Sequence, residues 1–210
     1  MGRLPGFGIV LLLSSAALPA QQRQLDPQLR YEVIQPESRV EFFVHSTLAD
    51  VDGVFSAYKA EFKVTTPRFE DVSFNLTVAA SSVHTGTSTK DKMVKGKNFF
   101  WVEKYPSITF VSRRIVPDPS NPLKFSMEGD FTLRGVTKPV TFQLTVDPQG
   151  NQHGHLYADL SFDRREFGMT YNMPFNRISD SVRVRFDLDV QGNAISAAAP
   201  DGSANTKITR

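Results

Sequence analysis

Phenylalanine is the residue type that most suggests a function in this chain, with 17 copies against a single tryptophan. Along the segments where apolar and polar residues alternate, eight of the phenylalanines are assigned to one shared apolar face. Alternation with period two predicts strands with one buried face, and rings gathered on such a face could enclose a long apolar molecule. The expected interior surface comprises Phe42, Val44, Phe62, Phe74, Leu76, Phe110, Phe131, Leu133, Phe142, Leu144, Phe162 and Phe186. The competing interpretation is an ordinary core in which these side chains pack against one another.

A second group of candidate residues lies in the segment 79–106, which does not alternate. Lys90 and Lys92 belong to a lysine-rich part of it, and Phe99, Phe100 and Trp101 follow. Ammonium groups bind phosphate as point charges, so the lysines could contact an anionic head group, although a solvated lysine face is the commoner explanation.

Two arginines in a later irregular segment, 164–181, are further candidates for contact with an anionic head group. Arg164 and Arg165 stand there beside Phe167 and Gly168, and we include Arg165 among the possible head-group contacts.

Catalytic and metal chemistry find little support in the sequence. The chain has no cysteine nucleophile, no G-x-S-x-G segment and no phosphate-binding glycine loop. His153 and His155 could share one strand face, but a structural zinc site needs four ligands, so we predict no metal site. We expect a binding protein and not an enzyme. The alternative is a barrel-type isomerase or cyclase acting on an apolar substrate.

Eight alternating runs must position these side chains. They cover residues 40–44, 54–64, 71–78, 107–110, 124–134, 140–146, 155–163 and 182–190, and nearly all are joined by short turns. An antiparallel sheet of eight strands can close into a barrel whose interior is filled by side chains or holds one small ligand. We therefore predict an all-β, eight-stranded antiparallel barrel, with a two-sheet sandwich as the alternative.

The long segment 79–106 is predicted to be ordered, because disordered segments are poor in aromatic residues. Residues 88–97 have a hydroxyl run before them and Gly96 near their end, which suits a short helix. We expect this segment to act as a lid that closes one end of the barrel.

The two ends of the chain are predicted to lie outside the barrel. Residues 1–20 combine Arg3, an apolar stretch and small residues, as secretory signal peptides do. Residues 25–192 form the expected barrel, and 193–210 an expected flexible tail. We expect a periplasmic or secreted protein, and no later apolar run is long enough to span a membrane.

Charge gives no argument for nucleic acid as a partner. The chain has 24 basic and 22 acidic residues, and removal of residues 1–20 takes away Arg3 alone, which leaves 23 against 22. A balance close to neutral provides no electrostatic footprint for a polyanion. With no cysteine, the fold must be held by its core.

Several segments resemble the YceI-like family of exported lipid-binding, or polyisoprenoid-binding, proteins. The resemblance covers about 31–190 and is carried by V-E-F-F-V, S-S-V-H-T-G-T-S-T-K-D-K-M-V-K-G-K-N-F-F, E-K-Y-P-S-I-T-F-V-S, G-D-F-T-L-R-G-V-T-K-P-V-T-F and R-R-E-F-G-M. It implies an extended lipocalin-like barrel whose interior holds a long isoprenoid for storage or transport in the periplasm. It also implies no cofactor besides the bound polyisoprenoid or isoprenoid quinone.

Overall fold

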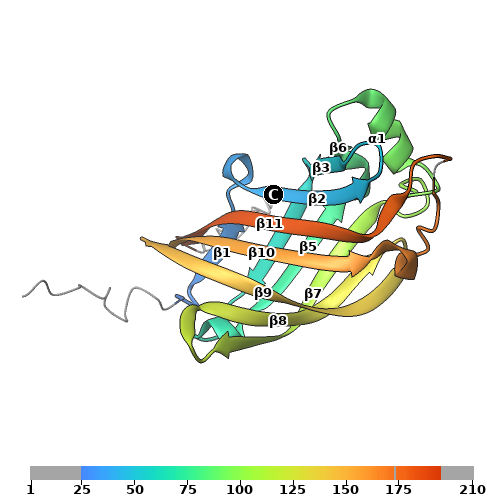
Figure 1. Ribbon diagram of the computed structural model, residues 1–210. Coiled ribbons are helices and arrows are strands. Elements are labelled where there is room, and N and C mark those ends of the chain that lie inside the picture. Colours follow the sequence, from blue (N-terminus) through green and yellow to red (C-terminus); the bar gives the residue numbers. More distant parts are fainter. Residues whose placement is uncertain (1–24, 173, 195–210) are drawn as a thin grey trace, which may run out of the picture.

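The computed structural model describes residues 25–172 and 174–194, and these form a curled antiparallel sheet with a helical lid (Figure 1). Its strands are β1 Leu29–Val33, β2 Arg39–Ser46, β3 Val51–Phe55, β4 Tyr58–Lys63, β5 Ser73–Ala79, β6 Val83–His84, β7 Ser107–Asp118, β8 Asn121–Leu133, β9 Val136–Gly150, β10 His153–Asp163 and β11 Ile178–Ala194. The single α-helix of the described residues is α1, Ser88–Lys95. Short 3-10 helices are η2 Gln35–Glu37, η3 Phe69–Asp71, η4 Ala80–Ser82 and η5 Arg164–Phe167.

The predicted all-β barrel is confirmed, but the strand count is eleven and not eight. Part of the difference arises because the predicted run 54–64 bends at Ser56 and Ala57 and so becomes β3 and β4. The neighbouring strand bends at the same level, where η4 joins β5 to the two-residue β6. Counting each bent strand once, and leaving the short β1 aside, gives the predicted number.

The two bent strands also close the barrel at the lid end. Among the described residues, β4 and β6 stand at opposite ends of the strand order. The bends nevertheless remain paired, since Ser56 N donates to Ser82 O at 3.2 Å and Ala79 N donates to Ala57 O at 2.9 Å. β3 pairs with both β2 and β6, while β4 pairs with β5. This single sheet excludes the two-sheet sandwich.

The opposite half of the barrel is completed by β1. β11 pairs with β2 over Ile178–Asp187 and with β1 over Val190–Ala194. β1 lies beside β4 without a backbone ladder between them in the described part of the chain, and Gln35 Nε2 bridges them by donating to Tyr58 O at 2.9 Å. Because β11 continues to Ala194, the first two residues of the expected tail belong to the sheet. The rest of the tail and the expected signal peptide lie outside the described residues.

The alternation predicted from sequence gives the barrel its apolar interior. In β8 the residues Phe125, Met127, Phe131 and Leu133 are buried, while their neighbours are partly exposed. Gly129 occupies the remaining inward position, and a Cβ atom there would lie 2.4 Å from Cζ of Phe110. The glycine therefore makes room for that ring to lie against the strand.

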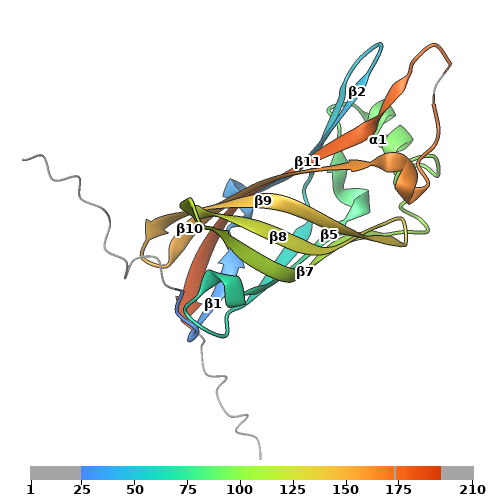
Figure 2. The same cartoon turned by 60° about the horizontal axis from the view of Figure 1, so that its bottom comes forward.

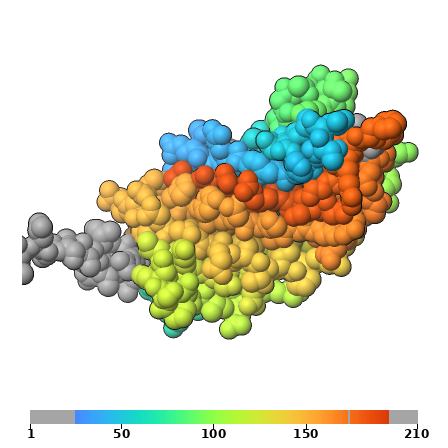
Figure 3. Space-filling model, in the orientation of Figure 1, coloured from blue at the N-terminus to red at the C-terminus, as the bar shows by residue number. Residues whose placement is uncertain are grey.

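The predicted lid helix is present and stands at one end of the barrel (Figures 2 and 3). Thr87 caps it by accepting a hydrogen bond from Lys90 N at 3.3 Å, and Gly96 follows its last residue. Val94 is the buried residue of the helix and faces the barrel interior. None of the helices in 25–172 and 174–194 has the length and apolarity required to cross a bilayer.

Candidate ligand-binding site

The interior of the barrel contains three hollows in series. We call the hollow beneath α1 the lid chamber, with a volume of about 80 Å³, and the hollow at the opposite end the far chamber, with about 330 Å³. A middle cavity of about 20 Å³ separates them. Phe186 lines both the lid chamber and the middle cavity, and Phe62 lines both the middle cavity and the far chamber. The apolar wall is thus continuous from one end of the barrel to the other.

Aromatic rings narrow the middle of this interior. The ring centroids of Phe110 and Phe142 lie 5.3 Å apart, and those of Phe142 and Phe186 lie 6.2 Å apart. Phe74 extends the row, 6.1 Å from Phe110. Part of the phenylalanine set therefore packs as an ordinary core, and a ligand that spans both chambers must displace these rings.

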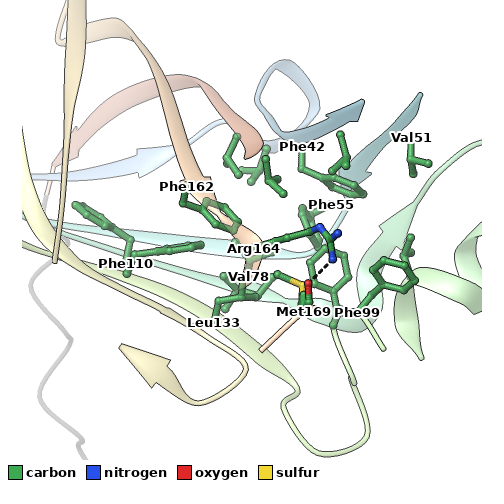
Figure 4. A pocket seen from close by; sticks show the side chains of 18 of the residues that line it. Phe42, Val51, Phe55, Val78, Phe99, Phe110, Leu133, Phe162, Arg164 and Met169 are labelled. Carbon is green, nitrogen blue, oxygen red and sulfur yellow. Dashed lines mark hydrogen bonds between the residues drawn. The ribbon is translucent and has the colours of Figure 1, made fainter. Parts of the chain in front are cut away.

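The lid chamber is almost wholly apolar. Phe42, Phe55 and Phe100 form a triangle of rings with centroid distances of 5.5 to 5.9 Å, in which Phe100 comes from the lid. Figure 4 shows Phe42 and Phe55 near one another in this chamber. Phe99 and Val94 also reach the chamber from the lid segment. Movement of the lid would therefore enlarge the chamber directly.

Arg164 supplies the only charged side chain among the described residues that line the lid chamber. Its side chain is 2% exposed, and its guanidinium donates to backbone oxygens of Met169, Tyr171, Ile178 and Ser179. The side-chain oxygens of Asn172 and Asp180 accept further bonds, at 3.1 and 3.3 Å. Burial lowers the pKa of Arg164, while Asp163 and Asp180 oppose that shift. The arginine joins residues 169–172 to residues 178–180 at the chamber wall, and its donors are occupied.

The far chamber combines apolar walls with a small number of polar groups. Tyr31, Asn151, Gln152 and His153 line it beside residues such as Phe62, and no lysine, arginine, aspartate or glutamate of the described chain does so. The Tyr31 hydroxyl donates to Gln152 Oε1 at 2.8 Å and accepts from the backbone N–H of Asp26 at 2.8 Å. Burial raises the pKa of Tyr31, so the hydroxyl remains a neutral donor.

All twelve residues predicted to form the interior surface line one of the three hollows. Phe42, Val44, Leu76, Phe110, Phe131, Leu133, Phe162 and Phe186 line the lid chamber, and Phe62, Phe74, Phe142 and Leu144 line the middle cavity. Phe99 and Phe100 line the lid chamber as well. Contact of these residues with a ligand remains a prediction.

The remaining candidate contacts lie outside the hollows. Lys92 is exposed on α1, and Lys90 Nζ lies 3.5 Å from Asp50 O. Trp101 packs edge-on against Tyr105, with Lys104 Nζ 4.6 Å from the centre of its ring. Strand alternation could not predict whether these residues face the interior or the solvent, because their segment has no strand periodicity.

Arg165 is a surface residue, whereas its neighbour Arg164 lines the lid chamber. Arg165 forms ion pairs with Asp163 at 2.6 Å and with Asp180 at 3.2 Å. The sequence makes both arginines comparable candidates, and Arg165, the one predicted to contact a head group, is the exposed residue. The buried partner could have been suspected from Phe167 and Gly168, which mark a tight turn that folds η5 back onto the barrel; Gly168 has a φ of +74°.

The two strand histidines are partly exposed at the far end, where His153 also lines the far chamber, and both lie close to carboxylates. His155 Nε2 lies 3.0 Å from Asp187 Oδ1, and His153 Nε2 lies 3.4 Å from Asp189 Oδ1. Potential ligand atoms of His153, Asp189 and Glu37 lie within 4.8 Å of one another. The prediction that the chain has no metal site stays a prediction.

Comparisons with known proteins agree with this architecture. A model of the YceI-like domain matches residues 31–190. A UPF0312 protein of Pseudomonas fluorescens is 33% identical over 134 residues, which make up 60% of this chain and 64% of the relative. One from Pseudomonas savastanoi is 29% identical over 143 residues, 66% of this chain and 70% of the relative. The chain therefore spans somewhat less than two thirds of the first relative and slightly more of the second.

Solved structures show the same fold at lower identity. BcnA of Burkholderia cenocepacia superposes with a TM-score of 0.68 and 24% identity, and the match covers 75% of this chain and 99% of BcnA. A polyisoprenoid-binding domain from Saccharophagus degradans superposes with a TM-score of 0.62 and 16% identity, over 79% of this chain and 99% of that domain.

Proposed function

The chain belongs to the YceI-like family, and from this premise we propose that it binds a long-chain isoprenoid or a similar amphiphilic lipid inside its barrel. The ligand is stored or carried in the periplasm or outside the cell, which is the compartment expected from residues 1–20. Its tail lies along the barrel axis and is the principal source of affinity. The proposal requires no catalytic residue.

The observation that carries this proposal is the apolar wall that continues through both chambers. Its residues come from nearly every strand, and Arg164, the one charged residue in the described lining of the lid chamber, has its donors occupied by the protein. A buried tail gains about 0.8 kcal/mol for each methylene group removed from water. The structural similarity to a polyisoprenoid-binding domain supports the same class of ligand.

The volumes indicate how such a ligand would fit. Small-molecule pockets usually have volumes of about 300 to 1,000 Å³, and the far chamber falls in that range at about 330 Å³. The lid chamber, at about 80 Å³, does not. A long ligand therefore enters through the far chamber, and its tail opens the middle cavity and the lid chamber by moving rings such as Phe142 and Phe100.

A chain-length series tests the proposal. Geraniol, farnesol, geranylgeraniol and longer prenols are titrated against the purified full chain by displacement of a fluorescent lipid probe. We expect the affinity to rise with each added isoprene unit until the barrel is filled. Affinity that is independent of chain length, or no binding at all, would contradict burial of the tail.

A further inference from the structure

The far chamber differs from the rest of the interior because its described lining has several polar residues but no lysine, arginine, aspartate or glutamate. Asn151 and Gln152 line its exposed rim, and His153 and Tyr31 complete its polar edge. The lid chamber, by contrast, has Thr109 and Arg164 as the polar residues of its described lining, and the donors of Arg164 are engaged by Tyr171, Ile178 and Ser179 among others.

A hydrogen bond from Tyr31 fixes the orientation of the Gln152 side-chain amide. Its Oε1 accepts a hydrogen bond from the Tyr31 hydroxyl at 2.8 Å, and its Nε2 makes no hydrogen bond within the described residues. An amide whose oxygen is occupied retains its two N–H groups as donors. Gln152 can therefore recognise an oxygen that accepts hydrogen bonds.

The backbone at this position is unusual and is fixed by its neighbours. Gly150, Asn151 and Gln152 have φ values of +84°, +52° and +60°. The turn is secured from β11, because Gly192 N donates to Gln152 O at 2.9 Å and Gln191 Nε2 donates to Asn151 O at 3.1 Å. Left-handed backbone at non-glycine residues is uncommon and persists where surrounding contacts impose it. The turn thus presents both amides at the chamber in a fixed arrangement.

The charge of the lining residues decides which head group fits. Burying an anion without a cation partner costs far more than burying a neutral group that finds a hydrogen bond. The far chamber has no lysine or arginine in its described lining, and the lid lysines Lys90 and Lys92 lie at the other end of the barrel, outside the hollows.

We infer that the far chamber holds the polar end of the ligand, and that this end is an uncharged oxygen acceptor such as a hydroxyl or a quinone carbonyl, with the tail directed toward α1. This inference rests on the proposed function. It places the head group at the left end of the barrel in Figure 1, beside the turn between β9 and β10.

The first test compares three ligands with one geranylgeranyl tail: geranylgeraniol, geranylgeranyl diphosphate and the corresponding hydrocarbon without an oxygen. We expect the full chain to bind the alcohol about tenfold or more tightly than the diphosphate. A diphosphate that binds as tightly as the alcohol would overturn the inference and leave the proposed function intact. If none of the three binds, the proposed function itself fails and the inference fails with it.

Two variants then locate the contact. Gln152→Leu should weaken the binding of the alcohol by about threefold to tenfold, the usual effect of losing one hydrogen bond. The affinity for the hydrocarbon should not change. Lys92→Gln is the control on the lid, and we expect it to change neither affinity. A loss for the alcohol in Lys92→Gln but not in Gln152→Leu would overturn the assignment.

A photoreactive geranylgeraniol with a diazirine next to its hydroxyl maps the position independently of affinity. Cross-links are expected in the peptide that contains residues 150–154. Cross-links confined to residues 88–101 would place the head group under the lid and contradict the inference.

Discussion

The lid chamber and the far chamber belong to one barrel and share the same alternating strands, yet they differ in volume and in the polarity of their lining. The lid chamber is small and lined by rings, with Phe42, Phe55 and Phe100 in mutual contact. The far chamber is larger and has amides at its edge. Strand parity accounts for the apolar surface of both, whereas the segments that join the strands account for the difference. An amphiphile needs both kinds of environment, one for the tail and one for the head group.

The largest expected effect concerns Arg164, which supports the lid chamber alone. Arg164→Met leaves carbonyl groups of Met169, Tyr171 and Ile178 without their donor. Breaking a buried charged network of this kind costs about 3 to 5 kcal/mol, and denaturant unfolding should show that loss in the free energy of unfolding.

The exposed neighbour provides the control for this experiment. Arg165→Gln removes surface ion pairs with Asp163 and Asp180, and such solvent-exposed pairs contribute little to the free energy of unfolding. Equal losses in the two variants would show that Arg164 has no special structural role.

A second prediction concerns the connection between the chambers. Gly129→Ala places a methyl group against the Phe110 ring and the Val111 carbonyl oxygen, where less than 3 Å is available. Overpacking of this kind costs about 1 to 3 kcal/mol, and the displaced ring should obstruct the middle cavity. Titration should show longer prenols losing more affinity than geraniol.

Gly154→Ala is the matched control for Gly129→Ala. Gly154 lines the far chamber, and the nearest atom to an added Cβ there lies 3.6 Å away. We expect its thermal unfolding to stay close to that of the unmodified chain. A loss as large as that of Gly129→Ala would contradict the packing difference between the two chambers.

A third prediction concerns the lid. Thr87→Ala removes the oxygen that caps α1, at a cost of about 1 kcal/mol. Hydrogen exchange should therefore accelerate in 88–95 and not in β9 or β10. Uniform acceleration across the barrel would mean that the lid does not open separately.

The smallest effect is the pH response of the surface pair beside the lid chamber. Hydrogen bonds from Arg165 lower the pKa of Asp163 from 3.8 to about 2. A lowered pKa in the folded state contributes stability above the ordinary pKa, and this contribution is lost as the pH falls toward 2. Carboxyl NMR titration should show the Asp163 pKa near 2 and its return toward the ordinary value in Arg165→Gln. An unchanged titration in the variant would refute the role of Arg165.

The sequence predicts the parts of this molecule that depend on periodicity. The inward side chains Phe74, Leu133 and Phe186 follow from alternation alone, and the lid helix follows from Thr87 and Gly96. Neither signal shows that the run 54–64 bends. At the bend the inward parity changes, since Phe55 is buried and Val54 is exposed, and the partners change from β2 and β6 to β5.

Residues in irregular segments could not be placed in the same way. The opposite environments of Arg164 and Arg165 depend on the turn at η5, and the role of Gln152 depends on contacts with Tyr31 and β11 that are distant in sequence. Such contacts exist only once the barrel is closed. Alternation along the strands therefore predicts which side chains face the interior, whereas the polar groups at its two ends depend on contacts that the sequence pattern does not show.

Native mass spectrometry of the purified full chain, followed by organic extraction of the same sample, tests the central claim most directly. The account predicts a noncovalent complex with one lipid per chain, and an extracted molecule with a long prenyl tail and no phosphate. Recovery of ligand-free protein alone from several expression hosts, together with no uptake of added prenol, would contradict it.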